Sequence, residues 1–182
     1  VIPTAIKVSA HIDLTQKLFP ALNILIKTIE DKADSLKNIV KTGRTHLMDA
    51  MPLEFQQELS AWASQLKNSK QTLHFLEKRV LEMPLGGTAV GTGINAHPRF
   101  AKLFAQELSS LSKGKFKYIP SEDFFHELSA QDTAVQVSGE LKNLAIILLK
   151  ISNDLRWMNS GPLAGLSEIE LKALQPGSSI MP

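Results

Sequence analysis

The sequence of 182 residues contains no cysteine. Disulfide frameworks and thiolate metal sites are therefore excluded, and nothing in the sequence demands an oxidising compartment. An excess of charge of one sign is also lacking, since 20 basic residues stand against 18 acidic ones and the formal net charge is +2. Nucleic-acid-binding proteins usually carry a clustered basic face, so we expect no nucleic-acid partner.

Long hydrophobic runs are missing as well. The longest, residues 144–149, ends at Lys150 and is far too short to cross a bilayer. We therefore expect no membrane association, and no signal peptide is visible at the start. Because the chain begins at Val1 and ends on Met181-Pro182, we expect it to be a piece of a longer protein, truncated at both ends.

Helical periodicity dominates what is present. Over residues 54–81 apolar side chains alternate steps of four and three without a slip, which is typical of a bundle or coiled-coil seam. Over residues 4–40 the same spacing predicts a helix, with a kink or break at Pro20. The first seam comprises Phe55, Leu59, Trp62, Leu66, Ser69, Leu73, Leu76 and Val80, and the second comprises Leu22, Leu25, Ile29, Ala33, Leu36 and Val40.

A third long helix is predicted over residues 129–159, and it is apolar on nearly every side. A shorter helix is predicted over residues 97–111 with Asn95 as its N-cap, followed by an extended segment at 113–119. We therefore predict an all-α fold, a long-helix bundle whose helices are joined by loop connectors. The third helix needs more partners than this chain supplies, which indicates oligomerisation or further helices.

The first connector contains Arg44, Thr45, His46 and Asp49. An imidazole can shuttle protons near neutral pH, and a neighbouring hydroxyl and guanidinium can hold a carboxylate. If the turn is helical, Asp49 would orient His46. The alternative is a solvated histidine beside an Arg44–Asp49 ion pair that only shapes the turn.

The second connector, residues 86–93, holds four glycines with Thr88 and Thr92. It lacks the Gly-Lys-Ser/Thr ending of a Walker loop and follows no predicted strand, so nucleotide binding is not expected. The glycines allow close backbone approach or positive φ, while the threonines cap or hydrogen-bond locally. Whether Thr88 and Thr92 also have a functional role stays open.

The third connector contains Gly177-Ser178-Ser179, whose amides and hydroxyls suit an anion. By composition alone it is a serine-rich linker, and no hydrolase elbow Gly-x-Ser-x-Gly is present. The histidines show no metal-ligand spacing, so we expect no metal site. Asn153, Asp154 and Arg156 are predicted to brace the turn that follows the third helix.

Together and in this order, the polar motifs resemble the fumarase and aspartase superfamily, over essentially the whole chain. Within it the chain is most similar to class II fumarases, because aspartases typically carry glutamine at the position of His46 and Gly-Ala in place of Gly86-Gly87. The matching motifs are Gly43-Arg44-Thr45-His46, residues 85–93, Asn153-Asp154-Leu155-Arg156, Ser160-Gly161-Pro162 and residues 177–182.

The resemblance implies a lyase that reversibly hydrates fumarate to L-malate, as in the tricarboxylic acid cycle, without a cofactor or metal. Ser178 would remove the carbon-bound proton and His46 would position or activate water on the opposite face. Thr45 and Ser179 would contact the dicarboxylate. The remaining loop residues would support these groups: Arg44, Asp49, Thr88 and Thr92.

The resemblance also implies that residues 1–182 form about three of the five bundle helices of a central domain. The parent would be a homotetramer, cytoplasmic in bacteria or in the mitochondrial matrix of eukaryotes. Substrate-binding lysine and asparagine residues would follow Pro182, and a Ser-Ser-Asn segment would precede Val1. The fragment alone is therefore expected to be inactive. The alternatives are an aspartate ammonia-lyase or other superfamily lyase, and a non-catalytic helical oligomerisation module.

Overall fold

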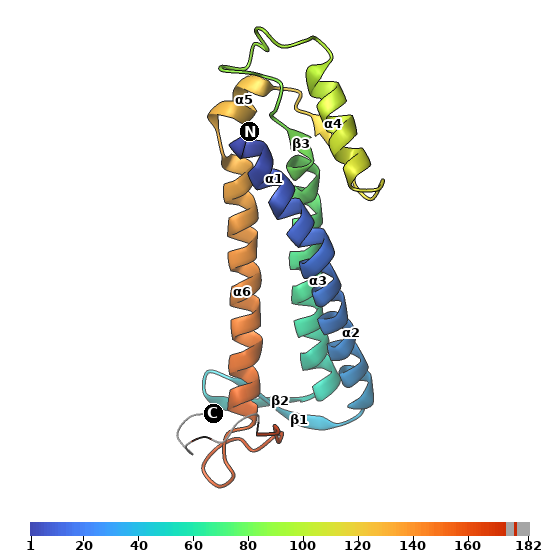
Figure 1. Cartoon of the computed structure of the whole chain (residues 1–182). Helices are drawn as coiled ribbons and strands as arrows, with labels where there is room; N and C mark the ends of the chain where they lie inside the picture. The colour runs from blue at the N-terminus through green and yellow to red at the C-terminus, as the bar shows by residue number, and fades with distance from the viewer. Residues whose placement is uncertain (174–176, 178–182) are drawn as a thin grey trace. The chain divides into compact units, whose positions relative to one another are not determined.

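The computed structural model describes residues 1–173 and 177 (Figure 1). The chain divides into two compact units, Val1–Leu141 and Lys142–Pro182. Long α-helices make up most of the described chain, so the predicted all-α class is confirmed. Among the described residues, no helix is both long and apolar enough to cross a membrane.

The first helical stretch is divided into α1 (Ile2–Asp13), a π-helical turn η1 (Leu14–Leu18) and α2 (Phe19–Ser35). The predicted break lies beside Pro20, which has no N–H to donate to a carbonyl one turn earlier. The preceding residue, Phe19, donates its N–H to the carbonyl of Leu14, five positions back, which closes the wider turn.

The predicted seam of this stretch is only partly correct. Leu22 and Ala33 are buried, but Val40 lies beyond the end of α2 and is 64% exposed. Helix α2 ends at Ser35, before Val40 is reached, and Phe19 and Ile26 complete its buried side.

The second predicted helix is α3 (Phe55–Val80), and all eight of its predicted seam positions are buried. The reciprocal capping box between Glu54 and Gln57 satisfies backbone donors at its start. The polar seam member, Ser69, donates a hydrogen bond of 2.7 Å to Glu140 Oε1, so its hydroxyl is paired although buried. Helix α2 packs along α3 (Figure 1).

The connector between α2 and α3 is a β-hairpin, where a loop was expected. Strands β1 (Val40–Thr45) and β2 (Met48–Glu54) pair antiparallel, with an irregularity between Thr42 and Arg44. The periodicity prediction missed both strands because they lack clean alternation and contain Gly43 and Pro52.

The remaining elements of the first unit are short. They comprise α4 (Phe100–Leu111), α5 (Phe124–Ser129) and a two-residue parallel pair of β3 (Glu82–Met83) with β4 (Ile119–Pro120). The predicted N-cap Asn95 is wrong. Its φ is +62°, and Arg99 occupies the N-cap position of α4.

A buried polar cluster ties α1 to the end of α3 and to α5. Lys7 forms an ion pair with Glu127 and donates hydrogen bonds to the carbonyls of Arg79 and Glu82, at 3.2 and 3.1 Å. One turn later, the ring nitrogens of His11 lie 3.1 Å from Tyr118 Oη and 3.0 Å from Glu77 Oε1. These pairings compensate the cost of burying charged and polar groups.

The third long helix, α6 (Asp132–Met158), begins in the first unit and continues into the second. In the second unit, Asn159 Oδ1 accepts a 2.8 Å hydrogen bond from the Leu171 amide, and Ser160 Oγ accepts one of 3.0 Å from the Leu166 amide. The turn after α6 is therefore braced by these two residues. Arg156 instead donates to Asn153, one turn earlier on the helix.

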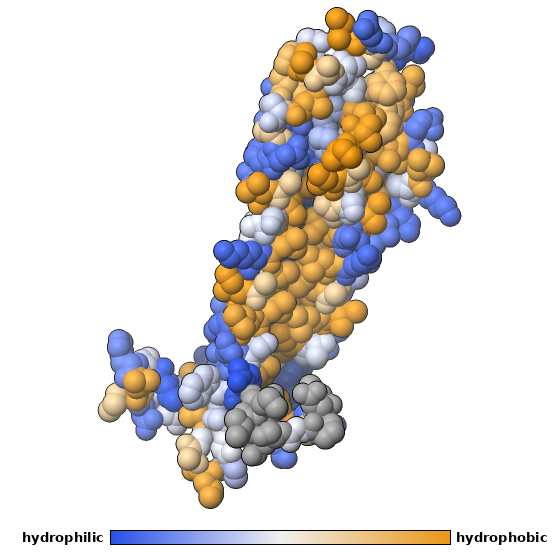
Figure 2. Space-filling model, turned by 60° about the vertical axis from the view of Figure 1, so that its left-hand side comes forward, coloured by the Kyte–Doolittle hydropathy of each residue, from blue (hydrophilic) through white to orange (hydrophobic). Residues whose placement is uncertain are grey.

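Hydrophobic side chains reach the surface along much of the face seen in Figure 2. Phe75 on α3 is 64% exposed, and on α6 Val135 and Trp157 are 68% and 69% exposed. Exposed apolar surface on this scale is typical of proteins that associate with partners.

Candidate functional site

The tip of the hairpin carries the most unusual backbone of the candidate site. His46 and Leu47 form its two-residue turn, with φ values of +49° and +64°. Two-residue hairpin turns with positive φ at both positions normally contain Asn-Gly or Asp-Gly, because other residues are strained there. Strain of this kind often marks a functional position.

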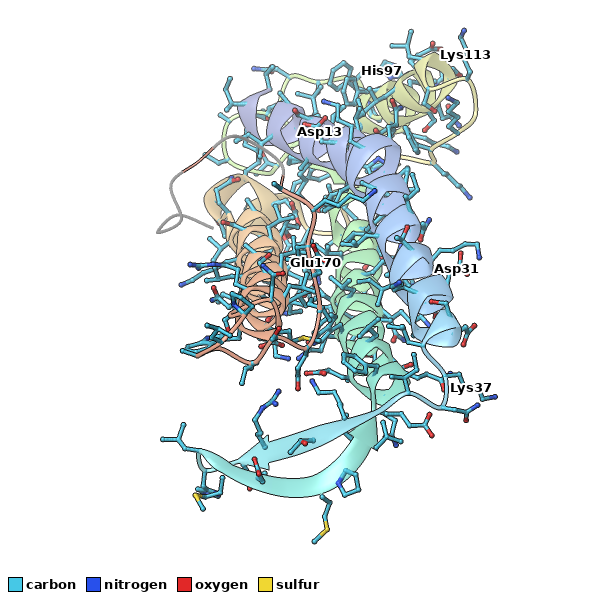
Figure 3. All side chains as sticks on the ribbon, turned by 90° about the horizontal axis from the view of Figure 1, so that it is seen from below. Asp13, Asp31, Lys37, His97, Lys113 and Glu170 are labelled. Atoms are coloured by element: carbon cyan, nitrogen blue, oxygen red, sulfur yellow. The ribbon has the colours of Figure 1, made fainter. Side chains whose placement is uncertain are left out.

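The hairpin holds Thr45 and His46 at an exposed end. Thr45 pairs with Met48, immediately beside the turn, and the side chains of Thr45 and His46 are exposed in this chain. The hairpin extends beyond the ends of α2 and α3 (Figure 3). Both groups are thus free to meet a substrate or another protein surface.

The base of the hairpin is fixed to α3. The buried Lys41 forms a 2.6 Å ion pair with Glu58, and its ammonium lies 5.0 Å from the ring centroid of Phe55. At Gly43, a Cβ atom would lie 2.3 Å from the carbonyl oxygen of Met51, so the close approach of the two strands requires glycine. This anchoring fixes the direction of the hairpin and hence the placement of His46.

Arg44 and Asp49 lie opposite one another in the ladder. Residues so placed share one face of the hairpin and interact across it. The turn is not helical, so Asp49 does not stand one helical turn after His46 as the sequence suggested. The pairing supports a role for Arg44 and Asp49 in shaping the arm that carries His46.

The glycine connector is shaped by close packing against α5. A Cβ at Gly87 would lie 2.7 Å from Leu128 Cδ1 and 2.8 Å from Phe124 Cβ. A Cβ at Gly91 would lie 2.9 Å from the ring and backbone of Phe125, and the φ of Gly91 is +111°. These glycines therefore allow close approach, and nothing in this geometry forms a phosphate cradle.

The two threonines of this connector differ in their surroundings. Thr92 Oγ1 accepts a hydrogen bond of 3.4 Å from the Ile94 amide, a local turn contact. Thr88 has a φ of +59° and lines a cavity of about 110 Å³ together with Val1 and Thr4. The Thr4 hydroxyl is buried and has no hydrogen-bond partner among the described residues.

The candidate residues do not all meet within one chain. The hairpin immediately precedes α3 and the glycine connector follows its end, and a helix of 26 residues is about 39 Å long. The hairpin with Thr45 and His46 is thereby separated from the connector with Thr88 and Thr92, as the positions of β1, β2 and β3 at opposite ends of α3 illustrate (Figure 1). Ser178 and Ser179 lie outside the described residues.

The pairing of His11 with Tyr118 and Glu77 was not predicted from the sequence. Its partner Glu77 also accepts from His74, whose Nδ1 lies 3.0 Å from Glu77 Oε2. The spacing of His74 and Glu77 on α3 could have signalled their contact, but no local pattern connects either residue to His11. Among residues 1–173 and 177, no group of three His, Asp or Glu side chains is arranged to hold a metal ion.

Comparison with known proteins gives a consistent result. The family model described as a lyase matches residues 1–182. Class II fumarate hydratases of Pseudomonas aeruginosa and Xylella fastidiosa are 54% and 53% identical over 182 residues, which is 100% of this chain and 39% and 38% of theirs.

Among solved structures, the class II fumarase of Schistosoma mansoni superposes with a TM-score of 0.94 at 35% identity, covering 99% of this chain and 40% of that one. The chain thus spans about two fifths of the length of its relatives. The family model matches every residue. The similar sequences and the similar structure are both class II fumarases of that family. The chain belongs to this lyase family, and its relatives there are class II fumarate hydratases.

Proposed function

We propose that the protein to which this chain belongs reversibly hydrates fumarate to L-malate. The observation that carries the proposal is the 54% identity with a class II fumarate hydratase along the entire chain. The position of His46 in a strained hairpin turn supports it independently. The substrate is accordingly a dicarboxylate.

The chemistry demands two groups on opposite faces of the substrate. Removal of a weakly acidic proton beside a carboxylate produces a dianionic enediolate, which preorganised hydrogen-bond donors and positive charge stabilise. In the proposed assignment Ser178 takes the carbon-bound proton and His46 handles the water or departing hydroxide. Thr45 and Ser179 hold the carboxylates, and the product differs from the substrate only by water.

The proposal requires groups from more than one chain. The two ends of α3 are about 39 Å apart, so groups of the hairpin and of the glycine connector cannot share one small substrate within a single chain. We propose a homotetramer in which each site is built from several subunits. The exposed apolar side chains of α3 and α6 support such an assembly.

The same proposal includes a place in the tricarboxylic acid cycle, a cytoplasmic or mitochondrial-matrix location, and catalysis without an added cofactor or metal. It also holds that residues 1–182 form part of a central helical domain and are inactive alone. The span of about two fifths of the relatives' length supports this last point.

The test compares His46→Gln with the wild-type parent protein in fumarate and malate assays. Loss of a positioned acid–base group typically costs about 10²–10⁴-fold, so we expect kcat to fall within that range. The matched control is His97→Gln, another exposed histidine in a loop, and its activity should be unchanged. Unaltered hydration by His46→Gln would contradict the role of His46.

Two further assays separate the alternatives. Formation of fumarate from aspartate at a rate exceeding that from malate would identify an ammonia-lyase instead. Malate formation by the purified 182-residue chain would disprove that it is inactive alone. Absence of both activities in the parent protein would leave the non-catalytic oligomerisation module as the better assignment.

A further inference from the structure

An open cavity of about 410 Å³ lies between α2 and α3, and none of its lining residues belongs to the candidate site. On α3 it is lined by Lys67, Lys70, Gln71 and His74. Residues spaced three, four and seven positions apart share one helix face, so these four groups project from the same side of α3. All four can donate hydrogen bonds.

Helix α2 lines the opposite side of the cavity with residues that have the same spacing of three, four and seven positions. It contributes Asn23, Lys27 and Glu30, with the buried Ile26 beneath them. The lining therefore holds three lysines, one histidine and two amides against a single carboxylate. These groups converge on the cavity as hydrogen-bond donors, and the neighbouring carboxylates of Asp31 and Glu77 pair with Lys27 and His74.

The imidazole of His74 is held in place before any ligand arrives. It stacks on Phe19 with ring centroids 4.0 Å apart, and its Nδ1 lies 3.0 Å from Glu77 Oε2. The other oxygen of Glu77 lies 3.0 Å from Nε2 of the buried His11, which fixes the carboxylate in turn. Nε2 of His74 is thus the ring nitrogen that Glu77 leaves available for a ligand.

The lysines differ in how they are engaged. Lys67 pairs with Glu30, and Lys27 pairs with Asp31 at 2.8 Å. The hydrogen bond to Asp31 and the charge of Asp31 raise the pKa of Lys27, which keeps it cationic. Lys70 has no ion-pair partner within residues 1–173 and 177. Exposed pairs are worth little, so an anion can compete for Lys27 and Lys67.

We propose that this groove is a binding site for a compact polyphosphate anion of the pyrophosphate type. Ammonium groups act on phosphates as mobile point charges, whereas no arginine is present for bidentate recognition of a carboxylate. The volume lies toward the small end of ligand sites, which span about 300–1,000 Å³. The Asn23 and Gln71 amides would add neutral hydrogen bonds to the phosphate oxygens.

The test is calorimetric titration of the full-length protein with inorganic pyrophosphate at low ionic strength. We expect saturable binding by the wild type and about a tenfold or greater loss of affinity in Lys27→Gln/Lys70→Gln. The matched control is Lys37→Gln/Lys113→Gln, which removes the same charge after the ends of α2 and α4, away from the groove (Figure 3). Its affinity should stay within about twofold of wild type.

Three results would overturn the proposal. These are no saturable binding by the wild type, equal loss of affinity in both double variants, and binding of citrate as tight as that of pyrophosphate. The first would show that the groove is only a solvated charged face. The second would show general attraction to a basic protein, and the third would show that phosphate is not the recognised group. Lys27, Lys37 and Lys113 are exposed and Lys70 is half-buried, and circular dichroism should confirm that folding is unchanged in both double variants.

Discussion

At the scale of single residues, the local sequence pattern predicted which side chains are important. It did not predict the residues with which they form contacts. Ser69 was expected as the one polar member of the α3 seam, but only the structure reveals Glu140 as its partner. His11 is paired with Tyr118 and Glu77 from distant parts of the chain, and no sequence pattern predicted either contact. Partners 66 or 71 positions apart in the chain leave no periodic signal in a single sequence.

Tyr118 makes one of these buried contacts, and its titration can be followed separately. Burial raises the pKa of Tyr118 above its ordinary value of 10.0. Because the folded-state pKa is the higher one, the stabilisation is fully present below pH 10 and is lost as pH rises through the folded pKa. We therefore expect tyrosinate to form at a higher pH in the folded protein than in denaturant.

Ultraviolet difference titration measures this directly, since Tyr118 is the only tyrosine in the chain. The Tyr118→Phe variant provides the baseline, and its free energy of unfolding should fall less steeply above pH 10 than that of wild type. Equal tyrosinate midpoints in the folded and denatured chains would contradict the prediction.

At the scale of elements, periodicity predicted α3 with its full seam and α6 to within three residues at each end. It missed the hairpin because the turn is His46-Leu47, whereas the usual signal is Asn-Gly. It also missed α5, whose six residues are too few to show a helical period. Short elements are fixed by tertiary packing, which a local pattern does not contain.

Gly87 tests whether close packing fixes the glycine connector. In Gly87→Ala the new methyl group would meet Phe124 Cβ at 2.8 Å, and overpacking of this kind typically costs about 1–3 kcal/mol. We expect a comparable loss in the free energy of unfolding, measured by urea denaturation.

The matched control is Gly139→Ala on α6, where the added Cβ meets nothing within 4 Å. Alanine is favoured over glycine inside a helix, so this variant should be neutral or more stable by about 0.5–1 kcal/mol. If both variants were equally stable, α5 would not be packed against Gly87 as described.

At the scale of the whole molecule, the chain leaves a large apolar surface exposed to solvent. Val135, Trp157 and Phe75 are each more than three-fifths exposed. The prediction that α6 needs additional partners rested on its nearly uniform apolarity, and this exposure agrees with it. The identity and geometry of those partners are not encoded in any local pattern.

We therefore expect the 182-residue chain to associate with itself at micromolar concentration. Burying apolar surface contributes about 25 cal/mol per Å², so even a modest shared interface would favour association. Light scattering coupled to size-exclusion chromatography would measure the mass. A monomer at all concentrations would contradict the expectation, and replacing Val135 with glutamate should shift the distribution towards smaller species.

The hairpin has a consequence for how such chains can vary in length. Side chains alternate between the two faces of a strand, so one inserted residue between Gly43 and Thr45 would turn Thr45 to the opposite face. Two residues inserted in each strand would preserve both the pairing and the facing of Thr45, and would carry His46 outward by about 6.8 Å. Changes in the length of this arm should therefore be tolerated only as matched pairs of residues in both strands, and each such change would move the histidine by a fixed step.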